Sequence, residues 1–380
     1  MNIALNTSRD RYKLKVLDGL RGGAAIYVMV GHAIWLLATP AGPRADRPWW
    51  GWVQVGLAFL FRYGREAVML FFVLSGVVIH LRLAQSRLRS TPQFDFKLYI
   101  RQRVTRIYPP LLASVLFTAL VDTVGRAVNP AFYQGVAPQV DMGDMVTQFD
   151  NSTRAFAGNL LFLQSWVVPI FGSNTPLWSL GIERFFYGLY PLAFVPIYLR
   201  LGPRWAFALG WGVGLAQLVT GLAGNGGVEM SLVYFGMWLA GAAIAEALVS
   251  GWQWRGSSLL FGLAVASLPG LMMLYGRLPS AINEIAWGIL WALVLLGLLT
   301  SPASIIVAPV KRLIEQLSPL APQSYTLYLF HFPTLLCVSA VYLSIWPSLP
   351  AHFGLVAVGI AGCISFTAPL ARRLENIGRR

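Results

Sequence analysis

The sequence predicts an all-α integral membrane protein with about ten transmembrane helices, and three observations support that fold class. Apolar residues make up 56% of the 380 residues and charged residues only 12%, against roughly 45–50% and 25% in average proteins. The apolar residues are gathered into long runs. The basic residues that produce the net charge of +14 lie mostly between those runs, as the positive-inside rule predicts.

Eleven apolar segments can be distinguished along the chain. They cover about 17–38, 66–82, 107–124, 156–170, 178–199, 205–223, 229–249, 257–275, 283–300, 324–345 and 352–371. A membrane crossing needs roughly 17 residues or more, and segment 156–170 is shorter and contains Asn159, Gln164 and Pro169. We therefore expect ten spans and a re-entrant or surface helix near 156–170.

The distribution of Lys and Arg supports this count. With a cytoplasmic N-terminus and a non-crossing segment 156–170, most of the 29 basic residues fall on the cytoplasmic side. If that segment crossed, every later loop would change sides and the bias would vanish. Both termini are therefore predicted to be cytoplasmic, in a multi-pass protein of the cell membrane, expected to be a bacterial inner membrane.

Composition also excludes several classes of protein. A chain this apolar is not disordered, because disorder requires low hydrophobicity. Its basic residues do not gather on one soluble face, so nucleic acid is not expected as a partner. The two cysteines, Cys337 and Cys363, lie in late apolar runs and exclude a disulfide framework and a four-thiolate zinc site.

Ionisable residues inside the first span are the first functional candidates, because each costs about 2.5–3.5 kcal/mol on insertion. Arg21 and His32 are eleven residues apart, which places them on one helix face with His32 about 16 Å further along. Asp18 is three residues before Arg21 and can pair with it. Alternatively, Arg21 marks the cytoplasmic boundary and His32 bonds a neighbouring helix.

Two further spans carry charged candidates. Arg103 and Arg106 open the third span on one helix face, and paired guanidinium groups are suited to phosphate, although a positive-inside anchor would look the same. Glu183 in the fifth span lies at a depth comparable to that of His32, so the two could form a base and its orienting carboxylate. The structural alternative is a contact of Glu183 with Arg184 or Tyr187.

The tenth span carries Tyr325, Tyr328 and His331 at intervals of three residues. This polar stripe either contacts substrate or forms a structural network. Ser75 in the second span is a weaker candidate for a substrate contact, because helix packing explains it better. No phosphate-binding loop, dinucleotide fingerprint or His-Glu-x-x-His zinc motif is present, so no metal is expected.

Five motifs together resemble one known family. They are Leu17–Arg21 with Gly31-His32, Phe71–Gly76, Arg103–Pro109, Pro176–Leu180 with Glu183, Phe186 and Tyr187, and Ser324–His331. In this order they resemble the membrane-bound acyltransferase type 3 family, whose members acylate hydroxyl groups of sugars and lipids with acyl-CoA. The resemblance covers essentially the whole chain and implies a single transmembrane acyltransferase domain over 1–380. The family's ten-span architecture agrees with the count above.

The resemblance implies an acetyl-CoA donor and, as acceptor, a sugar hydroxyl on a glycan, lipid-linked saccharide or exopolysaccharide of the cell envelope. His32 would act as the general base or as a transient acyl carrier, with Glu183 orienting it. The remaining candidates divide into a donor group and an acceptor group. Arg21, Arg103 and Arg106 would hold acyl-CoA, and Tyr325, His331 and Ser75 would contact the acceptor or the oxyanion.

The chain departs from the family pattern at several positions. Arg184 stands where an aromatic or uncharged residue is usual, Phe330 stands where tryptophan is common, and Gly181 and Val77 also differ. These departures bear on acceptor specificity more than on the reaction. The rival function is a polytopic transporter that uses intramembrane Arg, His and Glu for substrate or proton passage, and a third is an inactive relative. Thioester turnover separates the enzyme from both.

Overall fold

The computed structural model describes residues 8–39, 47–88, 92–135, 140, 149–221, 227–252, 256–301, 307–346, 348–350 and 352–375. Both chain ends, for which a cytoplasmic location is predicted, lie outside these ranges.

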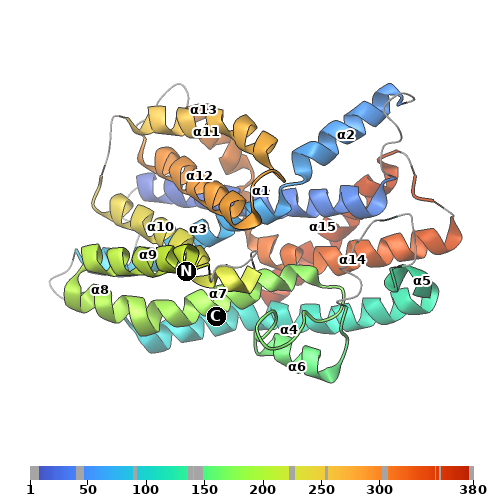
Figure 1. Ribbon diagram of the computed structural model, residues 1–380, viewed down its shortest axis with the longest axis horizontal. Coiled ribbons are helices and arrows are strands. Elements are labelled where there is room, and N and C mark those ends of the chain that lie inside the picture. Colours follow the sequence, from blue (N-terminus) through green and yellow to red (C-terminus); the bar gives the residue numbers. More distant parts are fainter. Residues whose placement is uncertain are drawn as a thin grey trace. The chain divides into compact units, whose positions relative to one another are not determined.

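The described residues are almost entirely helical, and only two isolated bridges, Asp150–Phe171 and Gln164–Val168, pair extended backbone. The helices are α1 (Ser8–Leu37), α2 (Trp49–Phe61), α3 (Gly64–Ser86), α4 (Phe96–Val128), α5 (Pro130–Tyr133), α6 (Thr153–Leu160), α7 (Trp178–Leu189), α8 (Val195–Leu201), α9 (Pro203–Val219), α10 (Ser231–Val249), α11 (Ser257–Leu274), α12 (Ser280–Thr300), α13 (Val307–Gln316), α14 (Ser324–Ile345) and α15 (Gly354–Leu374) (Figure 1). This content confirms the predicted all-α class.

Eight segments of the described chain are long and apolar enough to cross a membrane. They are Leu14–Leu37, Trp49–Ser86, Phe96–Val128, Ser231–Val249, Ser257–Leu274, Ser280–Thr300, Ser318–Ile345 and Gly354–Leu374. The other two predicted spans are also helical: α7 continues through a π-helical stretch, Tyr190–Phe194, into α8, and α9 has 17 residues. The protein is thus a polytopic helical membrane protein, while the count of ten stays a prediction.

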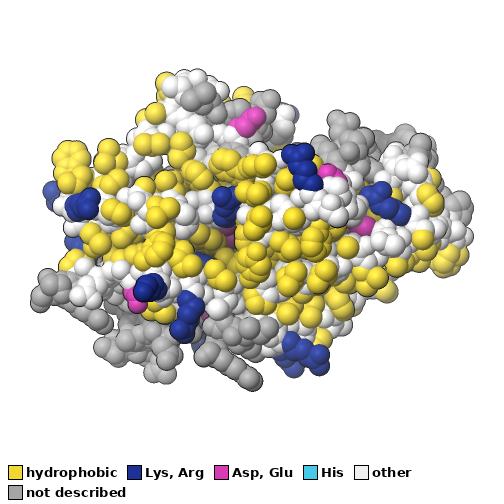
Figure 2. Space-filling view, turned by 90° about the horizontal axis from the view of Figure 1, so that it is seen from below, with side chains coloured by type: hydrophobic (Ala, Val, Ile, Leu, Met, Phe, Trp, Pro, Cys, Tyr) yellow, Lys and Arg dark blue, Asp and Glu magenta, His cyan; other side chains and the backbone are white. Residues whose placement is uncertain are grey.

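The surface of the helices is apolar where lipid is expected. Along α4, the side chains of Leu112, Leu116, Leu120 and Val124 are all exposed and repeat every fourth residue, so they line one face of the helix. Hydrophobic side chains also predominate on the face drawn in Figure 2, where charged side chains are few and scattered.

Helix α2 was not expected from the sequence, which placed the second span at 66–82. It is apolar apart from Gln54, whose buried side-chain amide donates to the carbonyl of Thr39. Arg62 and Tyr63 separate α2 from α3. With 13 residues, α2 is shorter than the roughly 17 that a membrane crossing needs, so a search for spans passes over it.

The segment predicted not to cross contains only a short helix and is not among the candidate spans of the described chain. That it stays on one side of the membrane is still a prediction. α6 begins at Thr153, ends at Leu160 and has eight residues, which rise only about 12 Å. An irregular stretch follows, with positive φ at Phe162 and Ser165. The side chain of Asn159 holds this stretch together by donating to the carbonyls of Ala155 and Pro169 and accepting from the N–H of Phe171.

A buried carboxylate fixes the end of the same segment to α4. Asp122 is 1% exposed and accepts from Ser173 N at 2.8 Å, Ser173 Oγ at 2.5 Å and Asn151 Nδ2 at 3.0 Å. Burial, followed by the nearby Asp122 carboxylate, raises the pKa of the Tyr133 phenol in α5 well above its usual range. Asp122 is therefore the anchor of the loop that leads to Ser173.

The chain forms two compact units, each built from three separate stretches. One consists of Met1–Ala24, Arg65–Tyr99 and Ile182–Leu320, and the other of Ala25–Gly64, Ile100–Gly181 and Ala321–Arg380. In the first unit, α3 and α10 pack with their backbones in contact, because a Cβ added at Gly76 would collide with the carbonyl of Trp238 and one at Gly241 with that of Val73. Small residues permit such close packing in membrane proteins.

Replacing the anchor should destabilise the protein. We expect Asp122→Ala to lower the free energy of unfolding by about 3 kcal/mol, because the buried N–H and hydroxyl of Ser173 would both lose their acceptor. Thermal unfolding of the purified protein in detergent measures the effect. Asp95→Ala, which removes an exposed carboxylate that accepts from Leu98 N near the start of α4, is the control and should cost about 1 kcal/mol or less. Equal melting temperatures for the two variants would contradict the assignment.

Candidate functional site

Two histidines from distant parts of the chain meet in the unit that contains α14. His32 on α1 and His331 on α14 are joined by a hydrogen bond of 2.8 Å between His32 Nδ1 and His331 Nε2. Their rings are stacked, with centroids 5.1 Å apart and an angle of 10° between the planes. His331 is completely buried, whereas His32 is partly exposed. This pair joins two residues that the sequence had singled out separately.

The other hydrogen bonds of His331 determine which of the two histidines donates in the bond between them. His331 Nδ1 lies 2.9 Å from the carbonyl oxygen of Tyr328 and 3.1 Å from that of Leu327. Carbonyl oxygens only accept, so Nδ1 of His331 carries the hydrogen. With both rings neutral, His331 Nε2 must then accept, and His32 Nδ1–H must donate. The lone pair of His32 is consequently on Nε2.

Aromatic rings enclose the pair. The Phe332 ring meets His32 edge to face at 5.0 Å, and Trp35, one turn further along α1, lies 6.2 Å away. Phe332 is fully buried. Such rings hold the imidazole in one orientation and shield it from water on those sides, which strengthens its hydrogen bond to His331.

The other motifs of this unit are bonded to α14. Ser179 Oγ lies 3.0 Å from Tyr328 OH, which also donates to the carbonyl of Pro176 at 3.3 Å. Tyr325 OH donates to the carbonyl of Ile107 on α4 at 3.4 Å. Tyr325 and Tyr328 therefore join helices within the protein, which is the structural alternative of the sequence analysis, and a contact of Tyr325 with the acceptor stays a prediction.

The two arginines of the third-span motif lie on the same helix as Ile107. Arg103 and Arg106 are both partly buried, while Arg101, two residues before Arg103, is exposed. Their binding of acyl-CoA stays a prediction.

The remaining sequence candidates lie in the other unit. Arg21 pairs with Asp18 at 3.7 Å, which confirms the expected i, i+3 contact. Glu183 accepts from Tyr187 OH at 3.2 Å, the local contact named as its alternative, and its orienting role stays a prediction. Ser75 accepts from Trp238 Nε1 at 3.3 Å. The neighbouring Gly76 is in close backbone contact with α10, as the helix-packing alternative for Ser75 predicts, and a contact of Ser75 with the acceptor stays a prediction.

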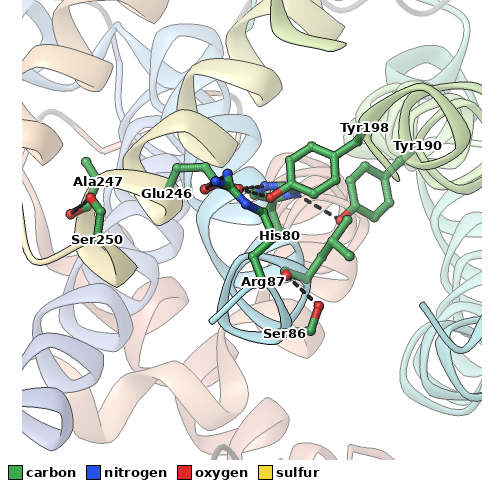
Figure 3. A network of polar contacts seen from close by, with 9 residues as sticks. His80, Ser86, Arg87, Tyr190, Tyr198, Glu246, Ala247 and Ser250 are labelled. Atoms are coloured by element: carbon green, nitrogen blue, oxygen red, sulfur yellow. Dashed lines mark hydrogen bonds and ion pairs between the residues drawn. The ribbon is translucent and has the colours of Figure 1, made fainter. Parts of the chain in front are cut away.

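The sequence analysis missed a polar network around His80 (Figure 3). His80 is completely buried, and its Nε2 and Nδ1 lie 2.8 Å from Glu246 Oε1 and 3.0 Å from Tyr190 OH. Glu246 also accepts from Tyr198 OH and, at 3.0 Å, from Arg87 Nη1. Both ring nitrogens and both carboxylate oxygens have partners, so this network ties α3, α8 and α10 together. Two sequence signals were available: His80 lies inside the apolar segment 66–82, and Glu246 lies inside 229–249.

A second missed cluster lies at the starts of α3 and α12. Arg65 pairs with Glu284, which also accepts from Tyr234 OH, and Asn283 Nδ2 donates to Glu66 Oε1 at 2.8 Å. Both carboxyl groups are nearly inaccessible to solvent. Within the described part of the chain, no group of three or more His, Cys, Asp or Glu side chains is arranged to hold a metal ion.

The chain is similar in sequence to known proteins. A relative, the acyltransferase MdmB of Streptomyces mycarofaciens, is 28% identical over 188 residues, which is 47% of this chain and 39% of that protein. The match thus spans well under half of the relative's length. No solved structure matches the chain. The family described as an acyltransferase domain matches residues 14–368, nearly the whole sequence. The chain therefore belongs to the acyltransferase type 3 family.

Proposed function

We propose that this protein is a membrane O-acyltransferase that transfers an acyl group from cytoplasmic acyl-CoA to a hydroxyl group of a sugar. Acetyl is the expected acyl group, and the acceptor is a glycan, a lipid-linked saccharide or an exopolysaccharide. Family membership supports the reaction class. The observation that carries the chemistry is the hydrogen bond from His32 to His331, because it leaves the lone pair of His32 on Nε2.

In the simplest mechanism His32 is the general base. Its Nε2 takes the proton of the acceptor hydroxyl while that oxygen attacks the thioester carbonyl. The tetrahedral intermediate then expels the CoA sulfur, which receives the proton from His32 Nε2. An O–H bond and a C–S bond break, and an ester C–O bond and an S–H bond form. His32 ends the cycle in its starting state.

His331 is the positioning residue in this mechanism. Its Nε2 accepts from His32 Nδ1 before and after His32 takes the proton, so the charged imidazolium keeps its partner. Both nitrogens of His331 are engaged, which suits it to orient His32 better than to hold an oxyanion. Tyr325 and Ser75 remain proposed contacts of the acceptor or the oxyanion, although each already has a protein partner.

The donor would be held by basic side chains. Arg21, Arg103 and Arg106 are proposed to bind the phosphates or pantetheine amides of acyl-CoA, since guanidinium groups bind two phosphate oxygens at once. Glu183 is proposed to support the charge that develops on His32. In a second version of the mechanism, His32 Nε2 attacks the thioester and carries the acyl group to an external hydroxyl. The tautomer imposed by His331 suits both versions, because both need the Nε2 lone pair.

Removing the imidazole should abolish transfer. With radiolabelled acetyl-CoA and a glycan extract, we expect the wild-type protein to release CoA and label the glycan, and His32→Ala to do neither. His352→Ala, at an exposed histidine that accepts from Gly354 N, is the matched control and should keep full activity. Activity in His32→Ala would overturn both versions of the mechanism. Uptake of a solute into vesicles without CoA release would favour the transporter instead.

Removing the orienting partner should leave a slow enzyme. We expect His331→Ala to lower kcat about 100-fold, because His32 would then sample the wrong tautomer, with little change in KM for acetyl-CoA. Steady-state kinetics of CoA release measure both constants. Tyr328→Phe removes a hydroxyl that bonds Ser179 but leaves the histidine pair intact, so it should cost much less. A loss confined to KM would argue that His331 binds substrate.

The arginines should affect donor binding instead. Arg103→Ala and Arg106→Ala are each expected to raise KM for acetyl-CoA about tenfold or more, the loss expected for one charge-assisted hydrogen bond, while kcat changes less. Arg101→Ala, on the exposed side of the same helix, is the control. If all three variants raise KM equally, general positive charge rather than a specific phosphate contact would explain the effect.

A further inference from the structure

The helix that carries His331 contains a proline two residues after it. Pro333 lies inside α14, and proline has no N–H to donate to the carbonyl four residues earlier, which here belongs to Leu329. An unpaired carbonyl in a buried helix costs about 1–3 kcal/mol and allows the turn to bend. That turn is the one that holds His331.

A side chain from another segment occupies this position. Asn174 Nδ2 donates to the carbonyl oxygen of Leu329 at 3.0 Å, and both residues are completely buried. The orientation of the amide is fixed, because the Leu329 oxygen only accepts and so must face the NH2 group. The second hydrogen of Nδ2 goes to Thr118 Oγ1 on α4 at 3.1 Å. Thr118 in turn donates to the carbonyl of Ser114.

Asn174 is itself held rigidly. The residue before it, Ser173, donates two hydrogen bonds to the buried carboxylate of Asp122. The residue after it begins the stretch Thr175–Leu177, whose Pro176 carbonyl accepts from Tyr328 OH on α14. The amide therefore reaches Leu329 from a backbone fixed to α4 on one side and to α14 on the other.

Three successive carbonyls of α14 now have assigned donors. Those of Leu327 and Tyr328 accept from His331 Nδ1, and that of Leu329 accepts from Asn174. If the Leu329 peptide turned toward another donor, the neighbouring carbonyls would move with it, and His331 Nδ1–H would lose the acceptors that fix its tautomer.

We propose that Asn174 is a positioning residue for the His331–His32 pair: it supplies the donor that Pro333 removes from the Leu329 carbonyl and so keeps the turn of α14 that fixes the tautomer of His331. Asn174 touches neither the substrate nor the reacting atoms in this role. It acts through one peptide group of α14.

Replacing Asn174 and Pro333 separately and together tests this role. Asn174→Leu removes the donor while keeping a similar volume. Pro333→Ala restores a backbone N–H to the Leu329 carbonyl. If Asn174 acts as proposed, its replacement should matter in the native background and hardly matter when residue 333 is alanine.

The first readout is the state of the histidines in the full-length protein in detergent. The chain has four histidines, so ¹⁵N-histidine labelling gives a simple NMR spectrum. In the wild type we expect His331 to be protonated on Nδ1 and unprotonated on Nε2. Asn174→Leu should give a mixture of tautomers, and Asn174→Leu with Pro333→Ala should restore the single form. Asn174→Ala is read in the same way if the leucine variant does not fold.

The second readout is the rate of acetyl transfer. Only this measurement rests on the proposed function. Asn174→Leu should lower kcat about tenfold or more, as expected for a misplaced catalytic group, with KM for acetyl-CoA nearly unchanged. In the Pro333→Ala background the same replacement should change kcat by no more than about twofold, the scatter expected when no coupling remains. Thr118→Val, which removes only the other partner of the amide, should leave the tautomer unchanged.

Two results would overturn the proposal. One is an equal effect of Asn174→Leu in both backgrounds, which would make its role independent of Pro333. The other is a His331 spectrum that is the same as in the wild type in both Asn174→Leu and Asn174→Ala. Because the NMR arm needs no turnover, a wild-type protein without acyl transfer would reject the proposed function and still leave this inference tested.

Discussion

The hydrogen bond from His32 Nδ1 to His331 Nε2 determines which ring nitrogen of His32 keeps its lone pair. Its direction follows from a single asymmetry: His331 Nδ1 faces two backbone carbonyls, and carbonyls never donate. The tautomer of His331 is thus imposed by its own helix, and the tautomer of His32 is imposed by His331. In the proposed mechanism, a lone pair fixed in this way is in place before substrate arrives, which would reduce the reorganisation needed in the transition state.

That arrangement is supported by the stretch of chain that begins with the short helix α6 and leads to α7. Backbone outside regular helices is tolerated at membrane depth only where protein groups satisfy it, and here Asn159 and Asp122 provide most of the partners. The same segment delivers Asn174 and Ser179 to α14. The polar residues that made 156–170 a poor span are therefore the residues that let it fold beside the histidine helix.

The structure also shows why intramembrane charge alone is a weak guide to chemistry. Glu246 is largely buried and Glu284 is almost completely buried, yet both carboxylates already have protein partners. His80, Arg87 and Tyr198 bond Glu246, and Arg65 and Tyr234 bond Glu284. Charges paired in this way are tolerable in a low-dielectric interior. His32 differs, because its partner fixes one nitrogen and leaves the lone pair on the other.

The sequence by itself determined the helical membrane class, the break in long apolar helix near 156–170, the Asp18–Arg21 pair and the candidacy of His32. These features depend on hydropathy, length and spacing within one helix, all of which are local. It missed α2, because the 13 residues of this helix, which end before Arg62, are fewer than the roughly 17 needed for a span. Tertiary structure alone decided that His331, 299 residues away, is the partner of His32, and that Asn174 meets the carbonyl left by Pro333. Such contacts depend on how each helix is rotated about its axis and which helices pack together, and hydropathy along one chain does not specify either.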